Sequence, residues 1–341
     1  MNDDALWLEP DYFEDFRCKC GDCRSCCCDG WDIAVSREEY FRLIGMECSD
    51  ELHHRLECAF RIPEEPAPER FRLISSNWLG ECPMRDEDGL CMLQKECGED
   101  ALPEICRVYP RSLKKEGELL QACCSGGCEA VVETLMNHDR LRFRFARLHA
   151  RPELVEATDV NLLMLGRICM ECLQDRSIEL RERILEVRRT VCGTDGKIPA
   201  LDAGLDAFEC VLPVLERASL MPYRDAILDL WNAHEKYAEA ANAFAARFPD
   251  WERWMENLLI NHLVYMNFPR VDARMSYEEA LKGLCGTWAL LRMACIAHTT
   301  EHPDEEAFVD AAAAVFRLVE HSSFYYTSHV MLENEAALLA L

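Results

Sequence analysis

Apolar residues recur at helical spacing almost without interruption from residue 139 onward. This periodicity predicts amphipathic helices that bury one face in a shared core. The segment Ser276-Tyr-Glu-Glu279 is a capping box, which marks a helix start, and Pro303 ends one helix and helps to start the next. The pattern predicts helices at about 139–150, 160–173, 174–191, 203–219, 222–247, 250–267, 276–298 and 304–320.

The N-terminal part has a different pattern, with short segments in place of long helical runs. Alternating residues at 31–35, 71–74 and 118–124 predict short strands. Capping residues at positions 36 and 49–50 predict two helices, which end near residues 46 and 60.

An Asp88-Gly89 pair predicts a tight hairpin turn that brings Cys82 toward Cys91. The sequence therefore predicts a mainly α protein. We expect a cysteine-rich module with short β ribbons at residues 1–138, packed on an α-helical region at residues 139–341.

Composition and charge narrow the class of protein. Half of the 341 residues are apolar and 29% are charged, which is typical of a soluble globular protein. The net charge of −25 repels nucleic acid and anionic lipid surfaces, so we expect neither as a partner. The first residues lack the basic and apolar segments of a secretory signal, and no run of about twenty uncharged apolar residues predicts a membrane span. We therefore expect a cytoplasmic protein.

The cysteines are concentrated near the N-terminus. Fifteen of the 21 lie between Cys18 and Cys128, and six of these lie within residues 18–28. Packing does not need this density, because a buried cysteine acts only as a small hydrophobe. Thiols stay reduced in the cytosol, and an odd total leaves one cysteine over in any disulfide scheme. The cysteines therefore indicate a metal or iron–sulfur centre, with zinc and iron–sulfur both open and reactive or buried thiols as the alternative.

The spacings match no common cluster motif completely. Cys20-x2-Cys23-x2-Cys26 is similar to the opening of a ferredoxin-type run, but residue 30 is glycine where that motif continues with cysteine. The Cys-x3-Cys-x2-Cys spacing of radical S-adenosylmethionine enzymes is also absent.

The thiol loop and the segments after it resemble a known family, the flagellin lysine-N-methylases, and more broadly the cysteine-cluster proteins that chelate zinc or iron. The resemblance is dense over about residues 16–132 and thin beyond them, and the extra thiols Cys20, Cys26, Cys97 and Cys123 depart from it. It rests on Phe16-x-Cys18-x4-Cys23-x3-Cys27-Cys28-x-Gly30-Trp31-x-Ile33, Cys82-Pro83, Asp88-Gly89-Leu90-Cys91, Gly98, Cys106-x2-Tyr109-Pro110-Arg111, Cys128-Glu129-Ala130 and a Glu256-Asn257 helix.

The resemblance implies an enzyme that methylates lysine side chains of flagellin-like proteins. It further implies S-adenosylmethionine as the methyl donor and a cysteine-ligated iron–sulfur centre of the 4Fe-4S type, with zinc as the alternative. More thiols match than one four-iron cluster can use, so either two centres exist or some of the thiols are structural. The implied metal ligands are Cys18, Cys23, Cys27, Cys28, Cys82, Cys91, Cys106 and Cys128.

Charge compensation and proton transfer suggest further site residues. Buried thiolates need positive charge nearby, and Arg107 and Arg111 are suitably placed in the sequence. Together with Asn257 they are the candidate cofactor-binding residues. Methyl transfer needs a neutral lysine amine, so a side chain must accept its proton. The candidate catalytic residues are Tyr109, Glu129 and Glu256. No glycine-rich nucleotide motif appears, so the sequence predicts no Rossmann site for the donor.

Two other functions remain open. The cysteine centre is also compatible with a non-catalytic iron–sulfur or zinc protein in which it supports the fold or carries electrons. A second alternative is a zinc hydrolase, because His298-Thr-Thr-Glu301-His302 has the H-x-x-E-H pattern. Pro303 follows at once, so this motif lies at a helix end.

Overall fold

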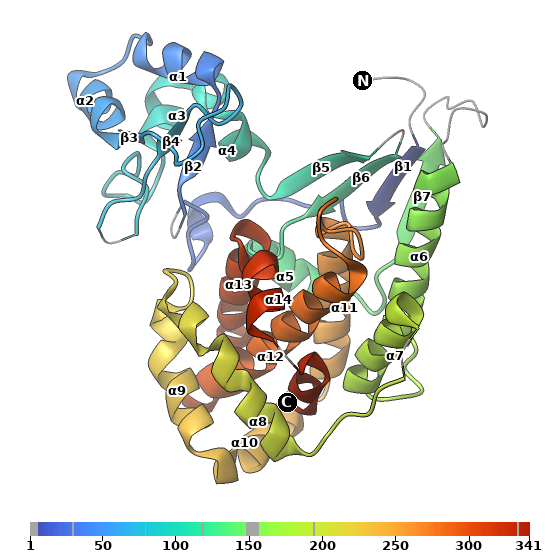
Figure 1. The fold of residues 1–341 in the computed structure, drawn as a ribbon. Helices are drawn as coiled ribbons and strands as arrows, with labels where there is room; N and C mark the ends of the chain where they lie inside the picture. Colours follow the sequence, from blue (N-terminus) through green and yellow to red (C-terminus); the bar gives the residue numbers. More distant parts are fainter. Residues whose placement is uncertain are drawn as a thin grey trace. The chain divides into compact units, whose positions relative to one another are not determined.

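The computed structural model describes residues 6–28, 31–78, 80–116, 119–147, 157–193, 195–332 and 334–341. The chain forms two compact units (Figure 1). Unit 1 contains Met1–Cys18 and Pro110–Leu341, and unit 2 contains Lys19–Tyr109. Unit 2 is thus an insertion in unit 1. These limits differ from the expected boundary at 138/139, because strands on both sides of the insertion pair within one sheet of unit 1.

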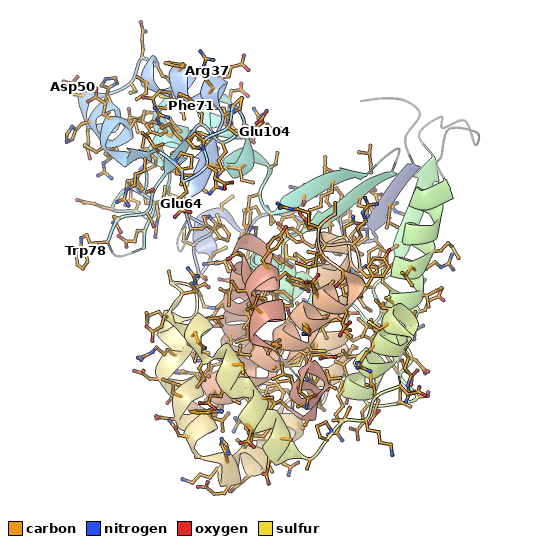
Figure 2. All side chains as sticks on the ribbon, in the orientation of Figure 1. Arg37, Asp50, Glu64, Phe71, Trp78 and Glu104 are labelled. Carbon is orange, nitrogen blue, oxygen red and sulfur yellow. The ribbon has the colours of Figure 1, made fainter. Side chains whose placement is uncertain are left out.

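Unit 2 combines a small sheet with short helices. The sheet has the order β2-β4-β3 with antiparallel pairs. The expected capping box at Ser36 is confirmed, since its side chain accepts from the Glu39 amide and the Glu39 carboxylate accepts from the Ser36 amide. Figure 2 labels Arg37, Asp50 and Glu104, where α1, α2 and α4 begin. The elements of unit 2 are η1 (Cys20–Asp22), β2 (Ile33–Val35), α1 (Arg37–Ile44), α2 (Asp50–Ala59), β3 (Phe60–Arg61), β4 (Arg72–Ile74), α3 (Met92–Cys97), η2 (Glu99–Ala101) and α4 (Glu104–Val108).

The core of unit 2 is small and includes thiols at its edge. Buried Val35, Leu43, Leu52 and Leu56 form its centre, and several half-buried cysteines, among them Cys82 and Cys91, pack against it. The expected tight turn is confirmed, because the Asp86 amide donates to the Leu90 carbonyl and Gly89 has a positive φ of 78°. This turn keeps the two cysteine-bearing segments at the same side of the core.

Unit 1 carries a four-stranded sheet in the order β5-β6-β1-β7. Its strands are β1 (Leu6–Pro10), β5 (Arg111–Glu116), β6 (Leu119–Cys124) and β7 (Phe143–Arg147). β1 runs parallel to β6 and antiparallel to β7. The helix expected at 139–150 is wrong within the described residues, since Phe143–Arg147 forms a strand that pairs with β1. Residues 148–150 lie outside the described part.

Helices make up the rest of unit 1, as the periodicity predicts. The run expected at 222–247 is divided at Ala233 into α9 and α10, and the run at 203–219 continues from α8 as a 3₁₀ segment that contains Pro213. The helices are α5 (Glu129–Met136), α6 (Ala157–Leu173), α7 (Leu180–Cys192), α8 (Leu201–Phe208), η4 (Glu209–Glu216), η5 (Met221–Tyr223), α9 (Arg224–Asn232), α10 (His234–Arg247), α11 (Trp251–Tyr265), α12 (Tyr277–Glu301), α13 (Glu305–His321), α14 (Phe324–Met331) and η6 (Glu335–Ala340).

The long helix α12 is the centre of unit 1. It contacts α13, α14, α9, α10 and η6. Among the described residues it is the one helix long and apolar enough to cross a membrane, but 94% of its most apolar window is buried inside the structure. Its apolar surface is therefore used by the core of unit 1.

One glycine of α12 allows close packing of α14. A Cβ at Gly283 would overlap the Tyr325 ring, which is buried. We expect Gly283→Ala to lower the free energy of unfolding by about 1–3 kcal/mol through overpacking, which exceeds the ~1 kcal/mol that alanine gains over glycine inside a helix. Denaturant unfolding of wild type and variant measures the difference. Equal or higher stability of the variant would contradict this packing.

Candidate functional site

The thiol loop of unit 2 brings three cysteines into direct contact. The Cys28 amide lies 3.4 Å from Cys26 Sγ. Hydrogen bonds from the thiols of Cys27 and Cys28 lower the pKa of Cys26 to about 2. The same contact raises the pKa of Cys28, because Cys26 takes the negative charge first. Cys26 is thus the site of a stabilised thiolate in this loop.

Three more cysteines of unit 2 lie in the field of this loop. Burial raises the pKa of Cys106, and the nearby thiols of Cys82, Cys91 and Cys27 add to the rise. Burial also raises the pKa of Cys91, with a further contribution from Cys26. Like charges so close together disfavour each other until a cation neutralises them. Cys82, Cys91 and Cys106 are thus near enough to the loop or to one another for their charges to interact.

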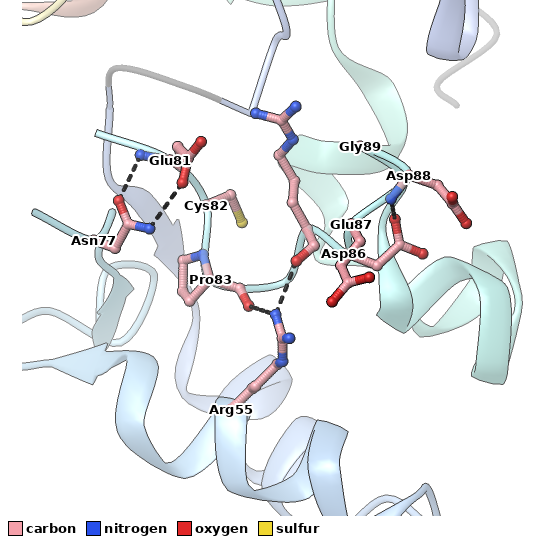
Figure 3. A pocket seen from close by; sticks show the side chains of 10 residues that line it. Arg55, Asn77, Glu81, Cys82, Pro83, Asp86, Glu87, Asp88 and Gly89 are labelled. Atoms are coloured by element: carbon pink, nitrogen blue, oxygen red, sulfur yellow. Dashed lines mark hydrogen bonds between the residues drawn. The ribbon is translucent and has the colours of Figure 1, made fainter. Parts of the chain in front are cut away.

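Cys82 also lines an open cavity of about 540 Å³. Figure 3 shows Cys82 and Pro83 in a loop segment that Arg55 approaches from below. The Arg55 guanidinium donates to the carbonyls of Pro83 at 3.1 Å and Arg85 at 2.8 Å. Asn77 and Glu81 close the far end through paired hydrogen bonds. The thiol of Cys82 is therefore reached from solvent.

These thiols suit a thiophilic metal by their chemistry. All 21 cysteines are present as thiols, and soft thiolates select zinc and iron–sulfur centres. Within the part of the chain that the structure describes, no three His, Cys, Asp or Glu side chains stand in a metal-binding arrangement. The donors thus fit such a centre in kind. Cys23 lies half-buried in the same loop.

The predicted ligands fall into both units. Cys18 and Cys128 belong to unit 1. The charge of Cys18 raises the pKa of Cys128, and the charge of Cys128 raises the pKa of Cys124. Burial raises the pKa of Cys124 to about 12, and Arg111 opposes that rise. Unit 1 therefore has a thiol group of its own, formed by Cys18, Cys124 and Cys128.

The predicted basic and aromatic residues have mixed surroundings. Arg107 is exposed in α4. Arg111 donates to the Phe16 carbonyl at 2.9 Å and lies 5.2 Å from the Phe16 ring centre. Tyr109 ends α4, and its ring lies 5.3 Å from that of Trp31 in an edge contact. Arg111 also places a positive charge near Cys124, which lowers the pKa of that thiol.

Glu256 occupies the centre of a buried ion-pair network. Its side chain is fully buried in α11 and lies 2.7 Å from Arg183 and 2.9 Å from Arg176. Arg183 is itself only 4% exposed and also contacts Glu252 at 3.2 Å. The carboxylate therefore joins α11 to α7 and to the turn before it. This geometry accounts for Glu256 as a structural residue.

Asn257 and Glu129 are buried in the same unit. The Asn257 amide donates to the carbonyls of Leu135 at 3.0 Å and His138 at 2.8 Å, and its oxygen accepts from the Leu141 amide at 3.3 Å. Asn257 thus fastens the end of α5 to α11. Glu129 begins α5 directly after Cys128 and is 1% exposed. A carboxylate at this position is stabilised by the helix dipole.

The histidine motif of the hydrolase alternative lies at the end of α12. The rings of His298 and His302 are 4.9 Å apart, and Tyr223 makes an edge contact with His298 at 4.8 Å. Burial lowers the pKa of His298. The two histidine rings and Tyr223 thus pack together in a small aromatic cluster.

The sequence did not predict a chain of hydrogen-bonded, largely buried polar side chains in unit 1. We call it the Glu320 chain. Ser125 Oγ lies 2.8 Å from His321 Nε2 and 2.7 Å from Glu320 Oε2. His262 Nδ1 lies 3.0 Å from Glu320 Oε1, and its Nε2 lies 2.8 Å from the Tyr325 hydroxyl. The five residues come from four places in the sequence. The Ser125-Gly126-Gly127 segment was the one local signal, since paired glycines indicate close backbone approach.

Next to this chain, Asn261 ties α11 to β6. Its amide donates to the Cys124 carbonyl at 2.9 Å, and its oxygen accepts from the Cys123 thiol at 3.0 Å and from the Tyr12 hydroxyl. The Tyr12 hydroxyl in turn accepts from the Cys124 amide at 3.2 Å. These bonds fix the end of β6, and with it Ser125, against α11.

Comparison with known proteins identifies the C-terminal part of unit 1. Residues 206–337 match the family model of the FliB lysine N-methylase C-terminal domain. Two relatives named lysine-N-methylase, from Salmonella choleraesuis and Salmonella typhimurium, are each 26% identical over 137 residues, which are 38% of this chain and 32% of theirs. The flagellar biosynthetic protein FliU of Salmonella muenchen is 25% identical over 137 residues, 38% of this chain and 76% of that protein.

The match thus spans about a third of the length of the two lysine-N-methylases. No solved structure matches the chain significantly. The family model covers the helical region, whereas the resemblance seen in the sequence is dense in the cysteine-rich part. Two different parts of the chain thus point to one family. The resemblance to the flagellin lysine N-methylases is confirmed by the match of residues 206–337 to the FliB lysine N-methylase C-terminal domain and by the relatives that bear the names lysine-N-methylase and FliU.

Proposed function

We propose that this protein is a cytoplasmic lysine N-methyltransferase that transfers methyl groups from S-adenosylmethionine to lysine side chains of flagellin-like proteins. The observation that carries the proposal is the FliB lysine N-methylase C-terminal domain at residues 206–337. The names of the relatives in Salmonella support lysine as the acceptor and a flagellar protein as the substrate.

We further propose that unit 2 holds an iron–sulfur centre on which the activity depends. The residues that would hold it are drawn from Cys23, Cys26, Cys27, Cys28, Cys82, Cys91 and Cys106, and zinc is the alternative metal. When bound, such a centre supplies inorganic cations that neutralise the thiolates, and it supplies redox capacity in the iron form. The mutual effects of these thiols on their pKa values support the site.

The chain's own residues must bind the acceptor and remove its proton. An ammonium group has no lone pair, so the lysine amine is neutral when it attacks the methyl group. The net charge of −25 favours approach of a lysine-bearing partner. Glu256 does not suit the second requirement, because its carboxylate is already paired with two arginines.

Methyl transfer is tested with anaerobically purified, iron-replete protein, S-adenosylmethionine labelled in the methyl group, and purified flagellin. We expect label in flagellin and methyl-lysine in its peptides by mass spectrometry. Flagellin in which the labelled lysines are changed to arginine is the matched control. If wild-type protein that retains its metal transfers no label to flagellin, the proposal is wrong and the non-catalytic metal protein becomes the better description.

A further inference from the structure

Two half-buried thiols of unit 2 lie outside the proposed metal centre. Cys48 lies in the connection between α1 and α2, and Cys97 is the last residue of α3. Neither belongs to the metal ligands that the family resemblance implies. Both pack against the edge of the core of unit 2. The proposed function therefore does not account for these two cysteines.

The residues next to the two thiols are hydrogen-bonded to each other. The Ser49 amide donates to one carboxylate oxygen of Glu96 at 3.1 Å, and the Ser49 hydroxyl donates to the other at 2.9 Å. The Cys97 thiol donates to the Glu47 carbonyl oxygen at 3.9 Å. That carbonyl belongs to the peptide bond that leads into Cys48. The two cysteines are therefore part of one contact between the α1–α2 connection and the end of α3.

The surrounding elements of unit 2 keep this contact in place. Arg42, in the last turn of α1, donates to the carbonyls of Ala101 at 2.8 Å and Leu102 at 3.1 Å, which follow α3 in the chain. The Ser49 hydroxyl also caps α2, because it accepts from the Leu52 amide at 3.2 Å. The first two helices are thus fastened to the end of α3 and to the segment after it.

The two thiols also interact through their charges. Burial raises the pKa of Cys48, and the charges of Cys97 and Glu96 add to the rise. A disulfide joins cysteines whose Cα atoms are about 4.4–6.8 Å apart, and the contact of the Cys97 thiol with the peptide group before Cys48 is compatible with such a separation. An S–S bond would also remove the repulsion between two thiolates.

We propose that Cys48 and Cys97 form a reversible disulfide by exchange with a low-molecular-weight disulfide. One thiolate of the pair attacks a sulfur of the small disulfide, whose S–S bond breaks, and one small thiol leaves. The other thiolate then attacks the protein sulfur of the mixed disulfide, forms the new S–S bond and releases the second small thiol. Two electrons thus pass from the protein to the small disulfide, and the two thiol protons go to the released thiols.

The disulfide would constrain a large part of unit 2. The loop that it closes contains α2, β3 and β4, together with the segment of Cys82. Small domains with a limited core gain stability from cross-links, because a cross-link restricts the unfolded chain. We therefore expect the oxidised form of unit 2 to resist local unfolding better than the reduced form. The pair thus makes the stability of this unit sensitive to the thiol–disulfide balance.

Peptide mass spectrometry of the full chain tests the proposal without any assay of methyl transfer. Anaerobically purified protein that retains its metal is equilibrated with mixtures of reduced and oxidised glutathione, and the remaining thiols are alkylated. Digestion with trypsin and a protease that cuts after glutamate separates Cys97 from its neighbouring cysteines. We expect a linked peptide that contains Cys48 and Cys97, and we expect it to disappear when reduced glutathione is restored.

Cys58 is the control thiol, because it lies exposed at the end of α2 and contacts the His54 ring at 3.8 Å. We expect it to carry glutathione as a mixed disulfide, and we expect Cys58→Ser to keep the linked peptide. Cys97→Ser is expected to lose that peptide and to carry glutathione on Cys48. If Cys58 is modified while Cys48 and Cys97 stay reduced, or carry one glutathione each, the proposal is wrong.

Limited proteolysis under non-reducing conditions tests the effect on unit 2. We expect oxidised glutathione to slow cleavage of unit 2 several-fold in wild type and to leave the rate in Cys97→Ser unchanged. Equal cleavage rates in linked and reduced wild type would overturn the stabilising role of the disulfide. Slower cleavage in both proteins would assign the protection to another thiol.

Discussion

Glu256→Ala is expected to lower the free energy of unfolding by about 3–5 kcal/mol, the usual cost of removing one partner of a buried ion pair. The substitution leaves Arg183 buried without its closest carboxylate, and it frees Arg176 from the bond that joins the start of α7 to α11. Denaturant unfolding followed by circular dichroism measures the change.

Glu252→Ala is the matched control, since Glu252 also contacts Arg183 but its side chain is 33% exposed. Screening by water limits such a contact to about 1 kcal/mol or less. If Glu256→Ala is no more destabilising than Glu252→Ala, the network does not stabilise unit 1. A folded Glu256→Ala protein that has lost methyl transfer while keeping wild-type stability would instead restore Glu256 as a catalytic residue.

Cys106→Ser and Cys91→Ser are expected to lose most of the bound iron and the broad absorption near about 400 nm that cysteinyl iron–sulfur centres show. The charges of Cys27 and Cys82 raise the pKa of Cys106, and the charge of Cys26 raises the pKa of Cys91. Even changes behind a ligand weaken metal affinity 10–100-fold, so we expect at least a tenfold lower iron content per protein. Elemental analysis after anaerobic purification measures it.

Cys210→Ser controls for cysteine loss in general, because Cys210 is exposed in η4 of unit 1. Its iron content is expected to equal that of wild type. Colourless wild-type protein with stoichiometric zinc would replace the iron–sulfur proposal with the zinc alternative. Wild type and the Cys106→Ser variant with equal metal content would remove Cys106 from the ligand set.

Periodicity alone predicted most of the helical region. Long runs such as α11, α12 and α13 repeat their apolar residues over many turns, so their existence and approximate ends followed from spacing. β7 was missed because five residues hold too few repeats to distinguish a strand from a helix turn. Its pairing with β1, more than 130 residues away, decided the outcome, and no local pattern contains that information.

The candidate site was less accessible to sequence reasoning. The thiols are recognisable by their density, but their division between units depends on where the chain leaves and re-enters the sheet of unit 1. The Glu320 chain combines single residues such as Ser125, His262 and Glu320, each ordinary in its own segment. Only the packing of β6, α11 and α13 brings them together. Glu256 was recognised as notable, and the structure supplied its arginine partners.

The insertion of unit 2 has a consequence for how such a chain can evolve. The chain departs after Cys18 and returns at Pro110, and at this junction Arg111 donates to the Phe16 carbonyl at 2.9 Å. The residues on either side of the inserted unit 2 are thus hydrogen-bonded to each other inside unit 1. Lengthening, shortening or exchanging the cysteine-bearing segment leaves this tie and the helical framework intact. We therefore expect the cysteine-bearing segment to vary more in length among related chains than the sheet of unit 1.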